Sequence, residues 1–379
     1  MVKVHWFRDK PEERNDWLRF GLMELAQKKE ISYYEWDLKK MTKYGFSKEI
    51  LSNHSLRHLS FLVVEEGTRK VKCIIDNEDS FVLFSDLIVY TDVYFCAGYN
   101  SDVFERKSTP KFYKWQTETD VKWYVDLLSK KIPLFESHFH KVRKFIPIGP
   151  NLWKEIPISK LKRFYLNNLH RIRKALRLSN QSQTVYEGFR SRYSDLLKLR
   201  NEKLRFDITL SDTSWGWPKH RIKLHQELRE LSKKGFKINS VLKLTEPSVC
   251  DDSVSENFDQ KNFPMKIGEI IDYEKMLASS RLGVFTCGFH WGWRNILTLS
   301  LFIGIPVVTD RLLTEAYFDL NTFKLWEIED ESWDLLNETL VKITPEDWKN
   351  IKTINQTTFE HWLNPETVAN YFIKTSLNS

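Results

Sequence analysis

The sequence is poor in cysteine and has no long apolar run, and both absences narrow the classes of protein it can encode. None of its four cysteines belongs to a Cys-x-x-Cys pair or to a cluster with zinc-site spacing; they are Cys73, Cys96, Cys250 and Cys287. The longest apolar run, 299–308, is interrupted by Pro306 and falls short of the roughly 20 residues that span a bilayer. The first ten residues have no apolar signal-peptide core and favour a first strand. We therefore expect a cytoplasmic protein with reduced cysteines and no structural metal.

Several motifs of nucleotide and hydrolase sites are also missing. The chain contains no Gly-x-x-x-x-Gly-Lys-Ser/Thr and no Gly-x-Gly-x-x-Gly, so a P-loop nucleotidase or a standard dinucleotide oxidoreductase has no support. No Gly-x-Ser-x-Gly occurs, which argues against an α/β hydrolase.

What is present indicates a globular protein of two domains. The chain has 379 residues, of which 41% are hydrophobic and 29% charged, enough apolar material for packed cores and too much charge for an integral membrane protein. Its formal net charge of +7 suits anionic ligands or an anionic membrane surface.

Short apolar runs alternate with amphipathic stretches, which predicts an α/β protein with mostly parallel sheets. In the first half we expect strands at 2–7, 32–36, 60–64, 87–90 and 145–148, helices at 16–28 and 118–129, and an inserted hairpin of 71–75 with 81–84. In the second half we expect strands at 206–210, 237–244, 282–287 and 307–309, and helices at 218–234, 273–279 and 294–302. Pro345 and Pro365 begin the last helices, which we expect to pack back across the domain interface.

A basic segment at 160–178 separates the two halves. Its first eighteen residues include seven Lys or Arg and no acidic residue, and its apolar residues keep helical spacing. Two interpretations stay open: a helix that adsorbs to an anionic membrane, or an interdomain linker helix with a solvated basic face.

A glycine-containing loop is the most informative feature for function. The segment 282–310 predicts a strand, a loop with Gly288 and Gly292, a helix that starts near Arg294, and the turn Gly-Ile-Pro-Val-Val. Free N–H groups at a helix start, glycines and a guanidinium together suit a phosphate.

This segment resembles the C-terminal, nucleotide-sugar-binding half of GT-B-fold glycosyltransferases, most clearly over 205–320. The resemblance implies two Rossmann-like domains that face each other across a cleft, with 1–155 binding the acceptor and 156–379 the nucleotide sugar. Many members of that family have an acidic residue for the ribose where this chain has Leu297. The ribose contact would then come from Glu315. Alternatively, the donor differs from the commonest one of that family, for example a sugar activated by a nucleoside monophosphate.

A second loop, 211–221, joins a strand to a helix, so it should open on the same crevice. Lys219, His220 and Arg221 would lie in the first helical turn, where cations are disfavoured unless an anion compensates. The alternative is that the preceding polar residues cap the helix and the cations point to water. We expect donor contacts from Arg221 first.

Other candidates flank these loops. His290 would donate to a phosphate or sugar oxygen, or pack among aromatic rings. Tyr273 and Glu274 lie where members of the resembled family contact the nucleotide, although an acidic residue also suits any helix start. For the tryptophans beside the loops, packing is the expected role; they are Trp215, Trp217, Trp291 and Trp293.

Glycosyl transfer with inversion needs a group that takes the proton of the acceptor hydroxyl. Asp9 is our first candidate, with His5, Glu12 and Glu13 nearby in the sequence. Glu136, with His138, is the second. An acidic cluster before a helix is also an ordinary cap.

The predicted function is therefore sugar transfer from a nucleotide-activated donor to a hydroxyl of a glycan or glycolipid. The resemblance implies bacterial surface polysaccharide synthesis, at the inner face of the membrane if the basic helix binds there. The chain has no Asp-x-Asp, the metal-chelating pair of the other large glycosyltransferase fold, so we expect no metal and no cofactor. A nucleic-acid-binding protein and a catalytically inactive sugar-binding relative remain alternatives; we expect no nucleic-acid partner.

Overall fold

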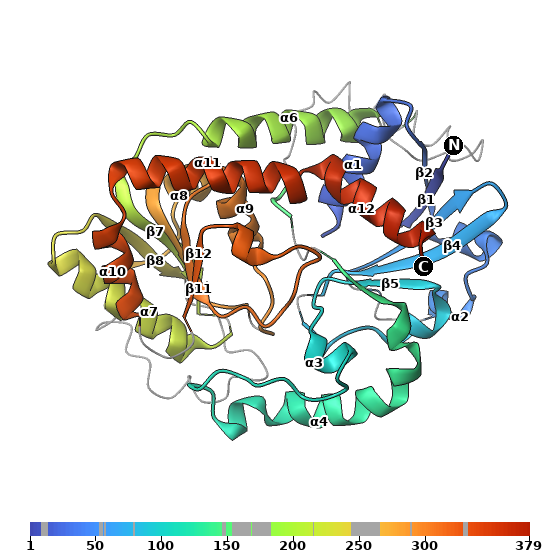
Figure 1. Ribbon diagram of the computed structural model, residues 1–379, viewed down its shortest axis with the longest axis horizontal. Coiled ribbons are helices and arrows are strands. Elements are labelled where there is room, and N and C mark those ends of the chain that lie inside the picture. The colour runs from blue at the N-terminus through green and yellow to red at the C-terminus, as the bar shows by residue number, and fades with distance from the viewer. Residues whose placement is uncertain are drawn as a thin grey trace.

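The computed structural model shows an α/β chain with two six-stranded sheets (Figure 1). This confirms the predicted fold class. The description covers residues 1–8, 14–52, 56, 58–78, 80–145, 149–153, 168, 183–214, 216–243, 266–288, 290–328 and 333–379.

The N-terminal sheet is parallel except for one strand. In spatial order it consists of β2 (Ser32–Asp37), β1 (Lys3–Arg8), β3 (Leu59–Glu66), β4 (Arg69–Asp76), β5 (Val93–Cys96) and β6 (Val142–Lys144). Only β3 runs against its neighbours, because β3 and β4 form a hairpin around Gly67, whose φ of 59° suits a residue without Cβ.

Helices of this half follow the expected pattern only in part. They are α1 (Asp16–Gln27), α2 (Glu49–Ser52), α3 (Ser101–Phe104), α4 (Glu118–Phe135) and the 3₁₀ helices η1 (Leu38–Tyr44), η2 (Asp86–Tyr90) and η3 (Glu136–Lys141). A capping box of Thr117 and Asp120 starts α4.

Two strand predictions in this half were wrong, and a third falls largely outside the described residues. The stretch 87–90 lies in η2, where the Ser85 side chain accepts from the N–H of Leu87 and caps a helical turn. Residues 81–84 form no strand, so the hairpin partner of β4 is β3. For the strand expected at 145–148, Phe145 lies just after the end of β6 at Lys144, and 146–148 lie outside the described residues, so it stays a prediction.

The C-terminal sheet is parallel throughout. In spatial order it consists of β12 (Leu325–Ile328), β11 (Val307–Asp310), β10 (Ser280–Phe285), β7 (Phe206–Thr213), β8 (Ile238–Lys243) and β9 (Lys266–Ile267). Numbered within this half, the order is 3-2-1-4-5-6, that of a doubly wound nucleotide-binding sheet. The strands predicted at 206–210, 237–244, 282–287 and 307–309 are all present.

Helices of the C-terminal half cover both faces of this sheet (Figure 1). They are α6 (Gln183–Leu199), α7 (Pro218–Lys233), α8 (Tyr273–Ala278), α9 (Asn295–Ile303), α10 (Asp334–Lys342), α11 (Pro345–Trp362) and α12 (Pro365–Leu377), with the 3₁₀ turn η5 (Leu320–Thr322). Pro218 is the first residue of α7, as predicted.

The last helix returns to the N-terminal half, as expected. In Figure 1, α12 lies against α1 and the N-terminal sheet. The Trp17 indole N–H donates to the carbonyl of Leu363 over 2.7 Å. The approach is close at Gly21, where an added Cβ would stand 1.8 Å from the carbonyl oxygen of Pro365.

Two predictions concern residues outside the described ranges. The basic helix at 160–178 lies there except for Asn168, and so does the expected domain boundary at 155/156. Both stay predictions. No helix among the described residues is long and apolar enough to cross a membrane.

Candidate functional site

The candidate site lies where the strand order of the C-terminal sheet reverses. There β7 is adjacent to β10, and their connections leave the sheet in opposite directions. In open α/β sheets, the loops beyond the carboxyl ends of such strands form the ligand-binding crevice. The loop after β7 and the glycine-containing loop after β10 are therefore neighbours, as the sequence predicted.

Asp212, at the end of β7, brings the two predicted arginines together. Its buried Oδ1 accepts from Arg221 Nη1 over 2.5 Å and from Arg294 Nη2 over 3.0 Å. Burial alone would raise the pKa of this carboxyl, but the two guanidinium groups outweigh it and hold the pKa well below its usual range. Asp212 is therefore ionised, and the cluster carries one net positive charge.

The two arginines differ in what they can offer a ligand. Arg221 is 2% exposed, and it also donates to the carbonyls of Gly216 over 2.6 Å and Cys287 over 3.1 Å. It therefore holds the two loops together from behind, which differs from the direct donor contact that we expected. Arg294 is 22% exposed at its side chain, and its Nη1 makes no hydrogen bond with any described residue.

The glycine-containing loop is closed on itself. The N–H of Gly288 donates to the carbonyl of Gly292 over 3.0 Å, and Trp217 Nε1 donates to the carbonyl of Gly288 over 3.3 Å. Trp217 and Trp291 both have positive φ, 51° and 63°, which is unusual for a bulky residue and stores strain at this point. Arg294 is the N-cap of α9, the residue after which the free N–H groups of that helix start begin.

Aromatic residues of the N-terminal half cover this loop. The fully buried Trp291 packs against Phe81, Phe112 and Tyr124, with ring centroids 4.4 to 5.4 Å apart. Tyr124 Oη is also 3.1 Å from His290 Nδ1. The packing role expected for Trp291 is confirmed, and the same contacts join the two halves of the molecule.

His220 is oriented by both halves of the chain. Its Nε2 is 2.8 Å from Asp310 Oδ1, and its ring stacks on Trp115 with centroids 4.1 Å apart. The other carboxylate oxygen of Asp310 accepts from the N–H of Cys287 over 2.7 Å. His220 thus supports the loop from a buried position, whereas Lys219 is exposed at the start of α7.

Of the three remaining donor candidates, only Tyr273 lies beside the arginine cluster. Burial raises the pKa of its phenol, which also feels the charges of Arg294 and Asp212. Glu274 is tied to α6 by Arg192 Nη2, which is 2.5 Å from its Oε2.

Glu315, the residue expected to contact a ribose, is instead bound to two residues of the N-terminal half. Its Oε1 accepts from the N–H of Ser101 over 2.8 Å, and its Oε2 pairs with Lys144 Nζ at 2.6 Å. Leu297 is 2% exposed and carries no polar group, as expected.

Only some of the proposed catalytic bases belong to the described residues. Asp9, Glu12 and Glu13 lie outside the described residues, as does Trp215. His5 is within β1 and is 6% exposed; its Nδ1 accepts from Trp36 Nε1 over 3.0 Å and its Nε2 is 3.5 Å from Glu65. Burial lowers its pKa. This places His5 in the strand expected at 2–7, in contact with Trp36, Glu65 and Tyr44 of the N-terminal half.

Glu136 is the first residue of η3, where it pairs with Lys107 at 3.2 Å and is 44% exposed. Its ion-pair partner Lys107 belongs to the N-terminal half of the chain. Within the described ranges, no group of three or more His, Cys, Asp and Glu side chains is arranged to hold a metal ion.

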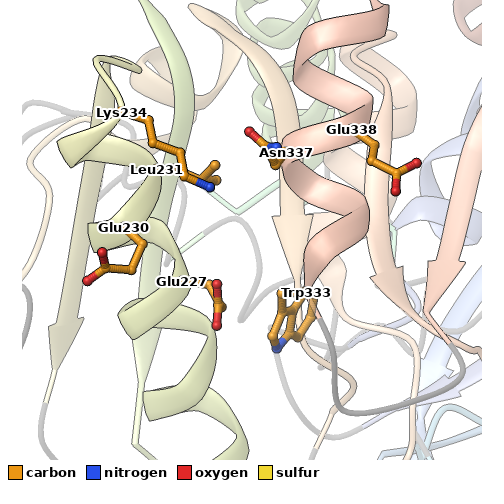
Figure 2. Close-up of a pocket in the computed structure, with 7 residues that line it drawn as sticks. All are labelled: Glu227, Glu230, Leu231, Lys234, Trp333, Asn337 and Glu338. Carbon is orange, nitrogen blue, oxygen red and sulfur yellow. The ribbon is translucent and has the colours of Figure 1, made fainter.

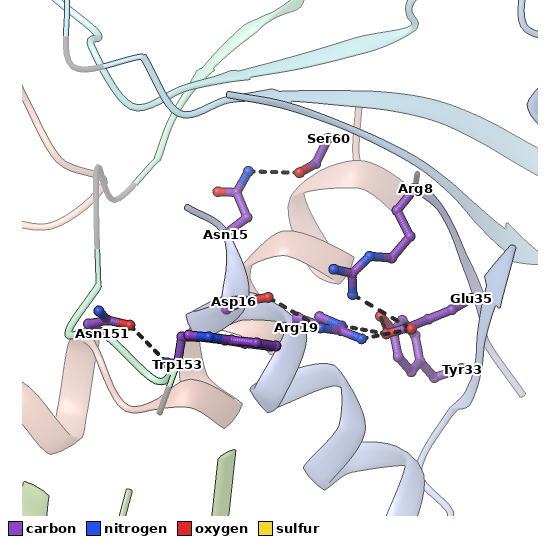
Figure 3. A network of polar contacts seen from close by, with 9 residues as sticks. All are labelled: Arg8, Asn15, Asp16, Arg19, Tyr33, Glu35, Ser60, Asn151 and Trp153. Carbon is purple, nitrogen blue, oxygen red and sulfur yellow. Dashed lines mark hydrogen bonds and ion pairs between the residues drawn. The ribbon is translucent and has the colours of Figure 1, made fainter. Parts of the chain in front are cut away.

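A buried charge network fixes the carboxyl end of β1, next to Asp9 in sequence (Figure 3). Glu35 receives Arg19 through both oxygens, at 2.6 and 2.9 Å, and Tyr33 Oη donates to it over 2.9 Å. Arg8 Nη1 lies 3.7 Å from the same carboxylate. Burial opposes ionisation of Glu35, but Arg19 outweighs it, so the pKa of Glu35 is lowered. This network keeps β1 in place for the loop that follows it.

His225 predicts an acid-sensitive step in stability. It is fully buried beside Ser240 Oγ at 2.7 Å, and burial lowers its pKa from 6.5 to about 4. In the unfolded chain it takes up a proton near pH 6.5, so the folded state loses stability as the pH falls from 6.5 towards 4. We expect this residue to cost about 2 kcal/mol between pH 7 and pH 5.

Urea unfolding of the wild type and His225→Asn at both pH values measures this step. The variant should lose less stability than the wild type on acidification, since other buried groups such as His5 titrate equally in both proteins. Equal losses in the two proteins would contradict the assignment.

Sequence analysis does not identify the two buried aspartates that hold the loops of the site together. It gives Asp212 no role beyond that of the polar residues that could cap a helix, and it gives Asp310 none. A usable signal existed, because both aspartates stand at the carboxyl end of a strand in the sheet that carries the site. Trp115, Gln116 and Tyr124 gave no such signal; they meet the site from the other half of the chain.

Comparisons with known proteins find likeness only among solved structures. No family model and no curated protein matches the sequence. The solved structures that match include trehalose-phosphate and sucrose-phosphate synthases.

Three of these matches illustrate the sequence identities, TM-scores and coverages that were found. An α,α-trehalose-phosphate synthase (UDP-forming) from Burkholderia vietnamiensis is 10% identical, with a TM-score of 0.38 over 77% of this chain and 62% of that chain. HepE from Anabaena, in complex with UDP and glucose, is 11% identical, with a TM-score of 0.34 over 78% and 84%. A structure from E. coli bound with UDP-2-fluoro glucose is 10% identical, with a TM-score of 0.32 over 48% and 46%.

The chain thus spans less than two thirds of two of these three proteins. At such TM-scores the likeness supports no argument about residues or substrates. The site must therefore be argued from its own contacts.

Proposed function

We propose that the protein is a glycosyltransferase that takes a sugar from a nucleotide-activated donor. The observation that carries the proposal is the arginine cluster at the switch point of the C-terminal sheet. Arg294 lies there at the start of α9 with one guanidinium nitrogen unpaired, and Asp212 and Arg221 fix its position. A phosphate oxygen at this point would meet a guanidinium donor and the positive end of a helix dipole.

The chemistry required of such a site is stabilisation of a leaving diphosphate. Arg294 supplies a hydrogen bond and a positive charge to the departing oxygen, and the surrounding apolar residues strengthen both. Gly288 and Gly292 let the backbone come close to the ligand, His290 lies between them in sequence, and Tyr273 lies beside Arg294 and Asp212. We further propose that transfer needs no metal and that the acceptor hydroxyl belongs to a glycan or glycolipid of a bacterial surface polysaccharide.

Arg294→Ala tests the proposal. A thermal-shift screen of UDP, GDP, dTDP and CMP first identifies the nucleotide that binds. We expect the variant to bind this nucleotide about 10- to 100-fold more weakly, as for the loss of a charge-assisted hydrogen bond. Isothermal titration calorimetry measures the change. Arg229→Ala removes an exposed arginine from α7 and should leave the affinity unchanged.

Three outcomes would count against the proposal. Full nucleotide affinity in Arg294→Ala would show that the phosphate site is elsewhere. A wild type that binds no nucleotide, but binds oligonucleotides with a steep salt dependence, would favour the nucleic-acid-binding alternative. Nucleotide binding without any sugar transfer would indicate the inactive sugar-binding relative.

A further inference from the structure

The glycine-containing loop is bound at two consecutive residues by the N-terminal half of the chain. At the first, His290, the ring Nδ1 is 3.1 Å from Tyr124 Oη. At the second, the indole N–H of Trp291 donates to Gln116 Oε1 over 3.0 Å, and its ring packs against Phe112 with centroids 4.6 Å apart. Both partners are far from the loop in sequence, so these contacts place the loop relative to the other half.

The two polar partners are themselves held in place. Gln116 Oε1 also accepts from the N–H of Tyr113 over 3.2 Å, which fixes the orientation of the side-chain amide. Tyr124 is 1% exposed, and its ring packs edge-on against Trp291 with centroids 4.4 Å apart. Gln116 and Tyr124 therefore offer the loop rigid hydrogen-bond partners.

The backbone of the loop needs such support. The φ of Trp291 is 63°, in the left-handed region that a bulky side chain disfavours, so contacts from elsewhere in the fold must maintain this conformation. The N–H of Trp291 donates to the carbonyl of Gly288 over 3.0 Å and closes the turn 288–291. Three residues further on, Arg294 begins α9. The side-chain contacts of Trp291 thus hold the turn from which the chain reaches Arg294.

The loop after β7 is held from the same side. His220, in the first turn of α7, stacks on Trp115, the residue before Gln116. Trp333 contacts the same imidazole with centroids 5.4 Å apart. Figure 2 shows this tryptophan at the start of α10, facing α7. One segment of the N-terminal half therefore reaches both loops of the candidate site.

We infer that Gln116 and Tyr124 are positioning residues for the phosphate site: through Trp291 and His290 they hold the glycine-containing loop in the conformation that receives the nucleotide. The inference rests on the proposed function. A loop that is ordered before binding spares the nucleotide the cost of ordering it, so the affinity depends on contacts that the nucleotide does not touch. Because such coupling is reciprocal, a nucleotide bound at the loop also strengthens its contacts with the N-terminal half.

Tyr124→Phe and Gln116→Leu test the inference. The first keeps the ring and removes only the hydroxyl, and the second removes the acceptor of the Trp291 indole. With whichever of UDP, GDP, dTDP and CMP binds the wild type, we expect each variant to bind about three- to tenfold more weakly in isothermal titration calorimetry. Wild-type affinity in either folded variant would overturn the role of that residue.

Tyr371→Phe is the matched control. The Tyr371 hydroxyl donates to the carbonyl of Lys144 over 2.7 Å, a bond that joins α12 to the N-terminal sheet and involves neither loop of the site. This variant should bind the nucleotide as the wild type does. An equal loss in Tyr371→Phe and Tyr124→Phe would overturn the inference, since any loosening of the two halves would then suffice. Failure of the proposed function looks different: Arg294→Ala then binds normally, or the wild type binds no nucleotide.

The Trp291 indole gives a readout that a merely structural role would not move. In protein labelled with ¹⁵N-tryptophan, its N–H resonance is the one of 14 that Trp291→Phe lacks. We expect saturating nucleotide to slow the exchange of this proton with solvent about threefold or more. The indole N–H of Trp17, which bonds to Leu363 away from the site, should change less. Equal slowing of both protons, or none at Trp291, would overturn the coupling.

Discussion

Asp212→Asn is expected to lower the free energy of unfolding by about 3 to 5 kcal/mol, because it leaves the buried Arg221 guanidinium without its counter-charge. In the wild type, Asp212 Oδ1 accepts hydrogen bonds from two guanidinium groups and from the N–H of Thr213. An amide of the same shape keeps one acceptor but loses the charge. Urea denaturation at neutral pH measures the change.

Two further variants make this expectation specific. Asp195→Asn removes a carboxylate whose partner Lys198 is 73% exposed, and it should cost less than about 1 kcal/mol. The double variant Asp212→Asn with Arg221→Leu should recover part of the loss, since the unpaired charge is then gone. A loss below about 1 kcal/mol in Asp212→Asn would mean that the arginines do not depend on this carboxylate.

Gly21→Ala is expected to destabilise the protein by about 3 kcal/mol or to detach α12 from α1. Local helix propensity predicts the opposite sign, because alanine favours a helix over glycine by about 1 kcal/mol. Here the new methyl group meets backbone, with the carbonyl carbon of Pro365 at 2.4 Å from it, so the neighbouring chain must move. The sign of the change in melting temperature decides between the two effects.

Gly67→Ala is the matched control for this variant. It makes the same substitution at a hairpin position where nothing lies within 4 Å of the new Cβ, although φ is 59°. It should cost only the conformational strain, about 1 kcal/mol. A higher melting temperature for Gly21→Ala would show that α12 is not held at this contact.

The C-terminal half was predictable because its local signals agree with its tertiary role. Pro218 begins α7 and Gly235 follows its end, and the strands around them are short apolar runs. The glycine-containing loop and Arg294 could be placed by the same logic, since a parallel sheet brings the carboxyl ends of adjacent strands together.

The first half resisted prediction where a short apolar run fits more than one structure. Residues 87–90 have the composition of a strand, but the Ser85 cap and the preceding Asp76 interactions favour a 3₁₀ turn. In the site itself, the contacts between Trp291 and Phe81, or between His220 and Trp115, join residues far apart in sequence. No spacing along one chain reveals such pairs.

The return of α12 to the N-terminal sheet has a consequence for the order of assembly during synthesis. On α1, Gly21 lies against Pro365, and Trp17 contacts Phe359 and Leu363 as well as Tyr193 and Phe302. A nascent chain that has emerged as far as the second sheet still lacks the part of this cover that comes from α11 and α12. The first half must therefore wait, partly uncovered, for almost the whole polypeptide to leave the ribosome, and a chaperone would find its binding surface there.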